Sequence, residues 1–383
     1  MRNIVAATTF RIIQIILLPI GAVGYVLFVV KLVTFSRRSG TSATVLASLY
    51  TRYMQHRLGT RRDEPCDRLM MVLPDISHLG LLLATAPTLL AQRLTGYVPR
   101  IYRYPYKGVP PMKHQPAART TFYDAALKRH IARIEQLVIL GAGFDTRAYR
   151  LPAGTRVRCF EVDTSKTQAF KREMLKKAGV DTTRVTYVPA DFLKEDWLEK
   201  LVDAGFEQDK PSFFLWESVT MYLDREAVES TLRKIAGTAA GSVVAFDYFS
   251  AELIEARSLF MRYARAVINA TGEPWRFGID NTPPVRERVA AFLESCGLSL
   301  EEQRNFGPEA DRKRAMAGFA TAIVKHTLTV TKAGEWLQRD VRTPKDFNAA
   351  SRSLGEDAVQ RDEGARRWRM THEYSSVTIC QLT

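Results

Sequence analysis

Short apolar runs alternate with charged, amphipathic stretches along this 383-residue chain. Gln136–Leu140 contains four apolar residues of five, β-branched ones among them, and predicts a strand covered on both faces. Similar runs predict strands at 155–163, 184–192, 212–223, 242–249 and 298–306. Segments 318–326 and 375–383 also have strand composition, and the sequence leaves open which of them forms the last strand. The alternation predicts an α/β fold with helices on both faces of the sheet.

Two glycines follow the first predicted strand. Gly141 and Gly143 can adopt backbone angles closed to other residues and let a ligand approach the main chain. From Asp145 onward the composition favours a helix, with Asp145 as its N-cap or first-turn acid. Strand, glycine turn and helix open a nucleotide-binding βαβ unit. Thr146 stands where a dinucleotide fingerprint needs its third glycine, which disfavours a nicotinamide dehydrogenase.

Acidic residues end the next three predicted strands. The second strand ends in Glu161 and Asp163, the third in Asp191 and the fourth in Glu217. Glu161 follows Gly141 by 161 − 141 = 20 positions, the distance at which an acid binds a ribose diol. Parallel strands present their carboxyl ends at one edge, where ligands bind, so the pattern favours a cofactor site over solvated turns.

Five motifs together resemble one enzyme family. "ARTTFYDAAL" (118–127), "VILGAGFDTRAYRL", "FEVD", "PADF" and "LWESVTMYL" occur in the order found in the leucine carboxyl methyltransferase family. The resemblance covers roughly residues 41–325. It implies a Rossmann-like class I methyltransferase sheet with an N-terminal helical lid. It also implies S-adenosylmethionine-dependent O-methylation of a carboxylate or hydroxyl on a small molecule or a peptide end.

The resemblance also implies roles for individual residues. No metal is expected, because the sequence shows no cluster of metal-ligating residues. In such enzymes the glycine turn, here Gly141 and Gly143, faces the methionine part of S-adenosylmethionine. The other implied cofactor contacts are Arg119 for the methionine carboxylate, Asp163 for the ribose, Asp191 and Phe192 for the adenine, and Glu217 for the sulfonium side. Glu217 and Tyr222 are the candidate catalytic residues, because a cationic sulfonium favours carboxylates and aromatic faces. For Arg119, a solvated surface charge is the alternative.

The residues that could bind or activate the acceptor are less clearly marked. No histidine lies between residues 131 and 325. This favours a carboxylate acceptor, which needs no base, or a base contributed by the lid. Asp124, with Glu217 and Tyr222, could orient an acceptor. Trp275, Arg276 and Phe277 could clasp one, with ordinary packing as the alternative.

The amino-terminal segment predicts a membrane anchor. Ile12–Val30 holds 19 uncharged residues between Arg11 and Lys31, about 28 Å as a helix and close to the hydrocarbon thickness of a bilayer. A secretory signal and a buried core helix are the alternatives. Residues 1–120 hold 16 Lys and Arg against 4 Asp and Glu, so this third carries +12 of the net +14. The basic flank after the run favours a single-pass protein with its catalytic domain in the cytoplasm, the alternative being a wholly cytoplasmic protein.

The same patterns predict four regions. These are 1–40, anchor and basic flank; 41–130, helical lid; 131–330, methyltransferase domain; and 331–383, C-terminal extension. Within the lid, 79–91 is too short to span a bilayer, is expected to be broken by Pro87, and predicts a lid helix or an interfacial one. Nucleic acid is disfavoured as a partner, since no aromatic-interleaved motif accompanies the basic residues. The rival functional hypothesis is a membrane-tethered cofactor-binding or scaffolding protein without turnover.

Overall fold

The computed structural model describes residues 2–39, 43–111, 114–152, 154–192, 194–256, 274–306 and 316–325. These belong to one compact unit, Met1–His326. The predicted C-terminal extension and its candidate strand at 375–383 lie outside the described residues.

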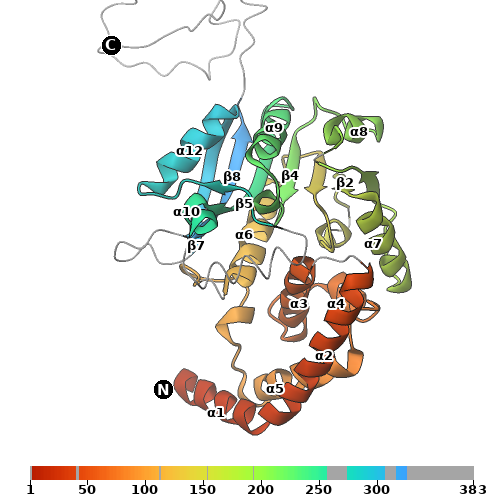
Figure 1. Ribbon diagram of the computed structural model, residues 1–383, viewed down its shortest axis with the longest axis vertical. Coiled ribbons are helices and arrows are strands. Elements are labelled where there is room, and N and C mark those ends of the chain that lie inside the picture. The colour runs from red at the N-terminus through yellow and green to blue at the C-terminus, as the bar shows by residue number, and fades with distance from the viewer. Residues whose placement is uncertain are drawn as a thin grey trace, which may run out of the picture. The chain divides into compact units, whose positions relative to one another are not determined.

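A mixed sheet of eight strands organises this unit (Figure 1). Its order is β3-β2-β1-β4-β5-β8-β7, with β6 paired to β5. The strands are β1 (Gln136–Leu140), β2 (Arg158–Asp163), β3 (Val185–Pro189), β4 (Ser212–Trp216), β5 (Val243–Ser250), β6 (Gly278–Ile279), β7 (Leu298–Phe306) and β8 (Ala317–Val324). The pairs among β1 to β6 are parallel, whereas β8 runs antiparallel to β5 and β7. The segment 318–326 therefore supplies a strand inside the sheet, and the predicted α/β class is confirmed.

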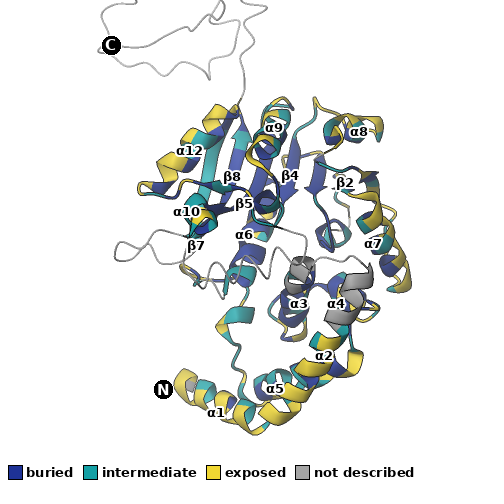
Figure 2. Cartoon of the chain, viewed as in Figure 1, coloured by how far each residue is buried: buried dark blue, intermediate teal, exposed yellow. Residues whose placement is uncertain are grey.

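Helices cover both faces because successive strand side chains point to opposite sides. On β1, Val138 and Leu140 belong to a core cluster that includes residues of α8, α9 and α12, whereas Leu137 and Ile139 belong to one that includes residues of α6. All five residues of β1 are buried, as a doubly covered strand requires (Figure 2). The helices of the sheet region are α6 (Gln115–His130), α7 (Ser165–Lys177), α8 (Trp197–Asp203), α9 (Arg225–Ala236), α10 (Ala251–Glu255) and α12 (Val285–Ser295).

Five further helices precede the sheet and gather at one end of it (Figure 1). They are α1 (Arg2–Ile16), α2 (Leu18–Ser39), α3 (Ala43–Arg57), α4 (Glu64–Met70) and α5 (His78–Thr95). Buried residues of α3, α4 and α5 form a third core cluster, which also contains Phe144 from the glycine turn and Met174 and Leu175 from α7. This shared cluster joins the helical region to the edge of the sheet.

The prediction of one continuous anchor helix over Ile12–Val30 is wrong. The segment is broken at Leu17, and the helical parts on either side are bent by 66°. Pro19 accounts for the break, because it lies in the first turn of α2 and has no N–H to donate to the turn before it. Among the described residues, no single helix has the length and apolarity to cross a membrane; the bent pair Asn3–Ile16 and Leu18–Lys31 meets that criterion only when taken together.

The expected break at Pro87 is also absent. Helix α5 continues through it from His78 to Thr95, capped by the Ser77 hydroxyl and ended by Gly96 with a φ of 67°. The helix packs closely against α2, where a Cβ on Gly24 would lie 2.3 Å from the backbone nitrogen of Ala84. Tertiary packing of this closeness outweighs the loss of one helical hydrogen bond at the proline.

This packing predicts different outcomes for two glycines of α2. Gly24→Ala should lower the free energy of unfolding by about 1–3 kcal/mol, since the new methyl group would meet the backbone of α5. Gly21→Ala is the matched control, because its Cβ would meet only the Pro87 ring at 3.4 Å and alanine favours the helix by up to about 1 kcal/mol. Chemical denaturation of both variants measures the difference, and equal stability would contradict the close crossing.

Candidate functional site

The glycine turn lies at the carboxyl edge of the sheet, between β1 and β2. Gly141 and Gly143 both have positive φ, 63° and 40°, so glycine is required for the shape of the turn. The Gly141 nitrogen donates to the Val162 carbonyl at 2.8 Å. A Cβ on Gly141 would lie 2.4 Å from a methyl group of Val219, which leaves no room for a side chain.

The helix expected from Asp145 onward is not formed. Only a short 3-10 helix, Arg147–Arg150, follows the turn before β2 begins. The N-cap of this helix is Thr146 and not Asp145, although the Asp145 carboxylate accepts from the Arg147 backbone nitrogen at 2.7 Å. The same carboxylate also pairs with the guanidinium groups of Arg147 and Arg52. Tertiary ion pairs at Asp145 and Arg147 therefore override the local helical preference.

The two acids of β2 have different surroundings. Asp163 is half-buried at the strand end and accepts from the backbone nitrogens of Gly143 and Thr164, each at 2.7 Å. Glu161 is fully buried instead, 2.8 Å from Lys171 Nζ and 2.9 Å from the Tyr149 hydroxyl. Burial raises the pKa of Glu161 to about 7 and also raises that of Asp163. Glu161 is thus structural, and Asp163 is the β2 acid that lies beside the glycine turn.

The predicted adenine residues lie on the same edge, just beyond β3. Asp191 and Phe192 are both half-buried. Asp191 Oδ2 lies 3.1 Å from Lys194 Nζ, and the Phe192 ring packs 6.2 Å from that of Trp197. Their side chains remain partly accessible to a ligand.

Arg119 is buried rather than solvated, which excludes the surface-charge alternative. Its guanidinium lies 3.3 Å from Glu217 and 3.3 Å from Asp247, and donates to Ser48 Oγ at 2.6 Å and to Ser218 Oγ. Burial opposes its charge, but Asp247 and Glu217 outweigh that cost and raise its pKa. Arg119 therefore ties α6 to the ends of β4 and β5.

Arg147 is the centre of this network, although the sequence analysis gave it no role. Its guanidinium contacts Asp145, Asp124 at 2.7 Å and Glu217 at 2.5 Å, and its side chain is only 1% exposed. Glu217 thus binds Arg147 through one oxygen and Arg119 through the other. The sequence did contain one indication of this role, since Arg147 follows the acidic residue Asp145 by two positions.

Further arginines from the lid complete the charge balance. Asp124, predicted as an acceptor-orienting group, binds Arg61 at 2.7 Å as well as Arg147. Arg61 in turn pairs with Asp63, which also accepts from Thr146 Oγ1 at 2.9 Å. These arginines outweigh burial and lower the pKa of Asp124 and of Asp63, while the pKa of Asp145 falls to about 2. The Asp124 carboxylate is therefore engaged in ion pairs with arginines, and its side chain is only 12% exposed.

Two more residues at this edge were missed from the sequence. Asp247 is an acid inside the apolar β5 run; it is 1% exposed and accepts from the Ser218 nitrogen at 2.6 Å. Ser218 has a φ of 60°, the single non-glycine residue with positive φ among those described. Strained backbone of this kind is held only where its surroundings over-determine it. The sequence could have indicated Asp247, because an acidic residue within an apolar strand is unusual. No feature of the sequence indicates the positive φ of Ser218.

The remaining candidates from the sequence differ in how accessible their side chains are. Tyr222 ends a short 3-10 helix, Thr220–Tyr222, and is half-buried. Trp275 packs edge-on against Phe249 at 4.8 Å, and Phe277 is a core residue with 1% exposure. Ordinary packing thus accounts for Phe277, whereas Arg276 is exposed.

The charged network retains capacity for an anionic ligand. Among the described residues, Arg147 Nη2 is a buried N–H group that makes no hydrogen bond, whereas Arg119 Nε is paired with Glu217 Oε1 at 3.3 Å. A buried donor without a partner is costly unless a ligand or water satisfies it. The carboxylate of the methionine part of S-adenosylmethionine matches guanidinium donors in charge and geometry. The residues at this edge therefore fit that cofactor.

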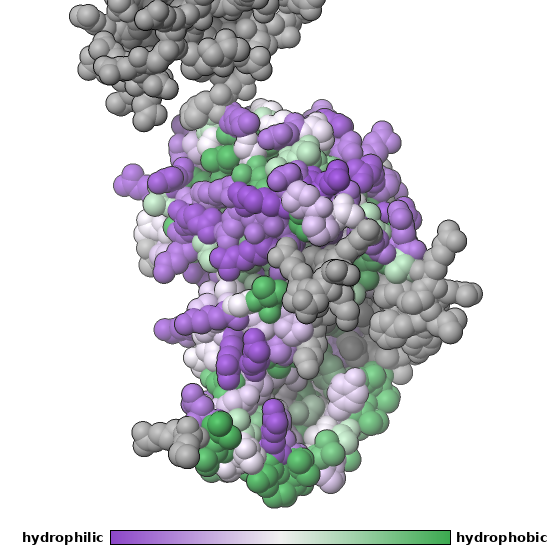
Figure 3. All heavy atoms as spheres, turned by 90° about the vertical axis from the view of Figure 1, so that its left-hand side faces the viewer, coloured by the Kyte–Doolittle hydropathy of each residue, from purple (hydrophilic) through white to green (hydrophobic). Residues whose placement is uncertain are grey.

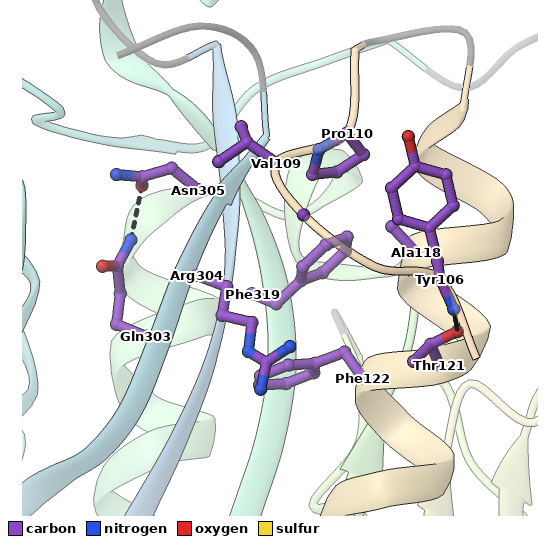
Figure 4. Close-up of a pocket in the computed structure, with 11 residues that line it drawn as sticks. Tyr106, Val109, Pro110, Ala118, Thr121, Phe122, Gln303, Arg304, Asn305 and Phe319 are labelled. Carbon is purple, nitrogen blue, oxygen red and sulfur yellow. Dashed lines mark hydrogen bonds between the residues drawn. The ribbon is translucent and has the colours of Figure 1, made fainter. Parts of the chain in front are cut away.

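A separate cavity of about 310 Å³ lies between α6 and strands β7 and β8 (Figure 4). The rings of Phe122 and Phe319 stack at 5.3 Å along one wall, and Arg304 extends beside Phe122. None of the predicted cofactor residues lines this cavity. It is therefore distinct from the edge described above.

Comparison with known proteins points to one family. Residues 97–236 match the sequence profile of the family described as leucine carboxyl methyltransferase. A protein of Frankia alni, named as a proposed S-adenosyl-L-methionine-dependent methyltransferase, is 41% identical over 128 residues, 32% of this chain and 44% of that protein. Proteins with the same kind of name from Mycolicibacterium paratuberculosis and Mycobacterium avium are 35% and 38% identical, covering 49% and 48% of this chain and 63% and 57% of theirs. The chain thus spans about half the length of these relatives.

Solved structures are more distant. A DUF574 family protein from Streptomyces avermitilis is 17% identical, with the match covering 72% of this chain and 96% of that protein, and the TM-score is 0.39. Magnesium protoporphyrin IX methyltransferase from Synechocystis, solved with bound S-adenosylhomocysteine, is 11% identical, covers 58% and 91%, and has a TM-score of 0.35. Scores this low carry no argument about function.

The network predicts a large cost for removing Arg147. Arg147→Met would leave Asp124, Asp145 and Glu217 buried with fewer cations, so the free energy of unfolding should fall by about 3–5 kcal/mol. Arg158→Met is the control, because the Arg158–Glu207 pair is about half exposed and should contribute about 0–1 kcal/mol. Urea unfolding at neutral pH measures both. A similar small loss in the two variants would contradict the central role of Arg147.

Proposed function

We propose, because residues 97–236 match the profile of the leucine carboxyl methyltransferase family, that this chain is an S-adenosylmethionine-dependent methyltransferase. The observation that carries the proposal is the set of ligand-binding features on one sheet edge. A glycine turn with no space for a side chain at Gly141 lies next to Asp163. Asp191 follows β3, which pairs with β2, and Glu217 follows β4, which pairs with β1. Their positions at one sheet edge support the cofactor roles that the family resemblance implies.

Each part of the edge has a defined task in cofactor binding. Asp163 would accept from the ribose hydroxyls, Asp191 and Phe192 would contact the adenine, and Arg119 would bind the methionine carboxylate. When bound, S-adenosylmethionine would supply a methyl group to an acceptor oxygen, which bonds to the methyl carbon as the carbon–sulfur bond breaks and S-adenosylhomocysteine leaves. Glu217, fixed by two arginines, would place a carboxylate at the sulfonium side without freedom to move away. Fixed placement of the reacting groups provides most of the acceleration in such a displacement.

The acceptor we propose is a carboxylate. Two of the lid histidines are engaged with carboxylate-bearing residues: His56 Nδ1 accepts from the Asp63 nitrogen at 3.0 Å, and His130 Nε2 lies 3.1 Å from Glu301. Tyr123 cannot serve as a base near neutral pH, because burial, with Asp247 next, raises its pKa well above the ordinary value. A carboxylate acceptor is already ionised and needs no proton removed. O-methylation to a methyl ester therefore suits these residues better than attack by a hydroxyl.

The cofactor assignment predicts a selective loss of affinity in Asp163→Asn. The variant keeps one acceptor oxygen, so it can satisfy only one of the Gly143 and Thr164 backbone nitrogens, which bind different oxygens of Asp163. It also loses the charge that strengthens bonds to the ribose diol, worth about 1.5–3 kcal/mol each. Affinity for S-adenosylmethionine, measured by isothermal titration, should fall about tenfold or more. Asp181→Asn is the control, since Asp181 also accepts from a backbone nitrogen, that of Thr183 at 2.9 Å, but precedes β3 rather than following it. Unchanged affinity in a folded Asp163→Asn protein would refute the ribose assignment.

The carboxylate acceptor predicts the chemistry of the product. Incubation of the full chain with cell lysate and methyl-labelled S-adenosylmethionine should give label that is released as methanol by mild base, because methyl esters hydrolyse there and methyl ethers do not. Label that is stable to base would support methyltransferase activity but would exclude a carboxylate as the acceptor. Cofactor binding without any transferred label would favour a binding or scaffolding role instead.

A further inference from the structure

The outer face of α1, α2 and α5 is unusually apolar. Of the 19 large hydrophobic side chains that are exposed in the described residues, 16 lie on these three helices. They include Ile15, Ile16, Leu18, Val23, Val26 and Leu82, each more than half exposed. Figure 3 shows apolar side chains gathered at this end of the molecule, and Figure 2 shows the same helices largely exposed. A patch of this extent on a water-soluble surface marks an interaction site.

The face belongs to a well-packed layer and is not a loose terminus. A Cβ on Gly80 would lie 2.7 Å from the backbone of Phe28, so α2 and α5 cross closely. Gln14 donates to Thr88 Oγ1 at 3.0 Å, and Lys31 Nζ donates to the Ile76 carbonyl at 2.8 Å. Phe10 is buried with 2% exposure. The inner side chains thus have partners within the fold, and the outer ones face outward from a defined surface.

Charge decides which partner fits. The sequences of α1, α2 and α5 contain no Asp or Glu, whereas Arg11 and Arg93 are exposed on α1 and α5. A second copy of the chain would bring the same positive charge against itself. An anionic bilayer instead offers an apolar layer beside negative headgroups, which attract cations by about 1 kcal/mol each. Both properties of the face therefore match a lipid surface.

We propose that the outer face of α1, α2 and α5 docks onto the surface of an anionic lipid bilayer. The helices lie at the boundary of headgroups and acyl chains and do not cross it. The 66° bend allows this, because α1, with 15 residues, is only about 22 Å long and cannot cover the hydrocarbon core. Docking leaves the sheet and its ligand-binding edge outside the bilayer.

Docking has a consequence for the acceptor, and this consequence alone rests on the proposed function. Leu81, on the inner side of α5, belongs to the same core cluster as Phe144 of the glycine turn. Arg52 of α3 donates to the Phe144 carbonyl at 3.2 Å. The helical layer therefore connects the lipid surface to the cofactor edge, and amphiphilic carboxylates held in the bilayer become the favoured acceptor class.

Co-sedimentation with vesicles tests the docking. The full chain is diluted from mild detergent into vesicles of phosphatidylcholine, with or without phosphatidylglycerol. We expect binding to the anionic vesicles to exceed binding to the neutral ones at least tenfold. Arg11→Gln and Arg93→Gln should each weaken anionic binding about fivefold, whereas Arg233→Gln, which changes an exposed side chain of α9, should not. Equal binding to both vesicle types would overturn the anionic assignment.

Matched valine substitutions test the apolar face. Val23→Glu and Val26→Glu should each reduce vesicle binding at least tenfold, since both side chains are 56% exposed on α2. Val202→Glu makes the same change on α8, where valine is 37% exposed, and should leave binding intact. Equal losses in all three variants would overturn the assignment of the face. Unchanged cofactor affinity in Val23→Glu separates loss of docking from failure of the proposed function.

Two further measurements exclude the other occupants of the face. A stable dimer of the full chain that fails to bind vesicles would overturn the proposal in favour of a second copy. Asn3→Cys should stay accessible to a membrane-impermeant thiol reagent added outside the vesicles, relative to the parent chain. Protection of this cysteine until the vesicles are opened would show that the helices cross the bilayer, which would also overturn surface docking.

Discussion

The Glu217 carboxylate, held between Arg119 and Arg147, is the interaction on which the site depends. One oxygen contacts the arginine from α6 and the other the arginine from the glycine turn, while Glu217 itself follows β4. Three segments distant in sequence are thereby fixed at one sheet edge. Because all three side chains are nearly buried, loss of one would leave a charge without compensation in a poorly solvated place.

The same network explains the local structure of the turn. Asp145 and Arg147 are engaged with partners from the lid and α6, so the chain makes a short 3-10 helix where its composition favours a longer one. Asp63 and Thr146 extend the connection into the lid. The lid is thus joined to the cofactor edge by buried charges as well as by apolar contacts. A substitution in the lid should therefore also change the structure of the cofactor edge.

The helical layer at the amino terminus combines two kinds of surface. Its inner side packs closely through Gly24 and Gly80, and its outer side presents apolar and basic groups. Backbone contact at the glycines lets α2 and α5 approach without large side chains between them. Many larger apolar residues of both helices then face outward. Contact with a lipid surface would remove these side chains from water.

The sequence by itself determined the strands, the glycine turn and the acids that end β2, β3 and β4, because these depend on local composition and spacing. It also located Arg119 through a motif. Only the tertiary structure decided that Arg147 and Asp247 share the network, and that Glu161 is buried against Lys171 while Asp163 borders the turn. It likewise decided that the amino-terminal apolar run forms two helices with a bend between them, and that helix α5 continues through Pro87. These outcomes depend on charges and packing partners that lie far apart in the chain, and no local pattern records them.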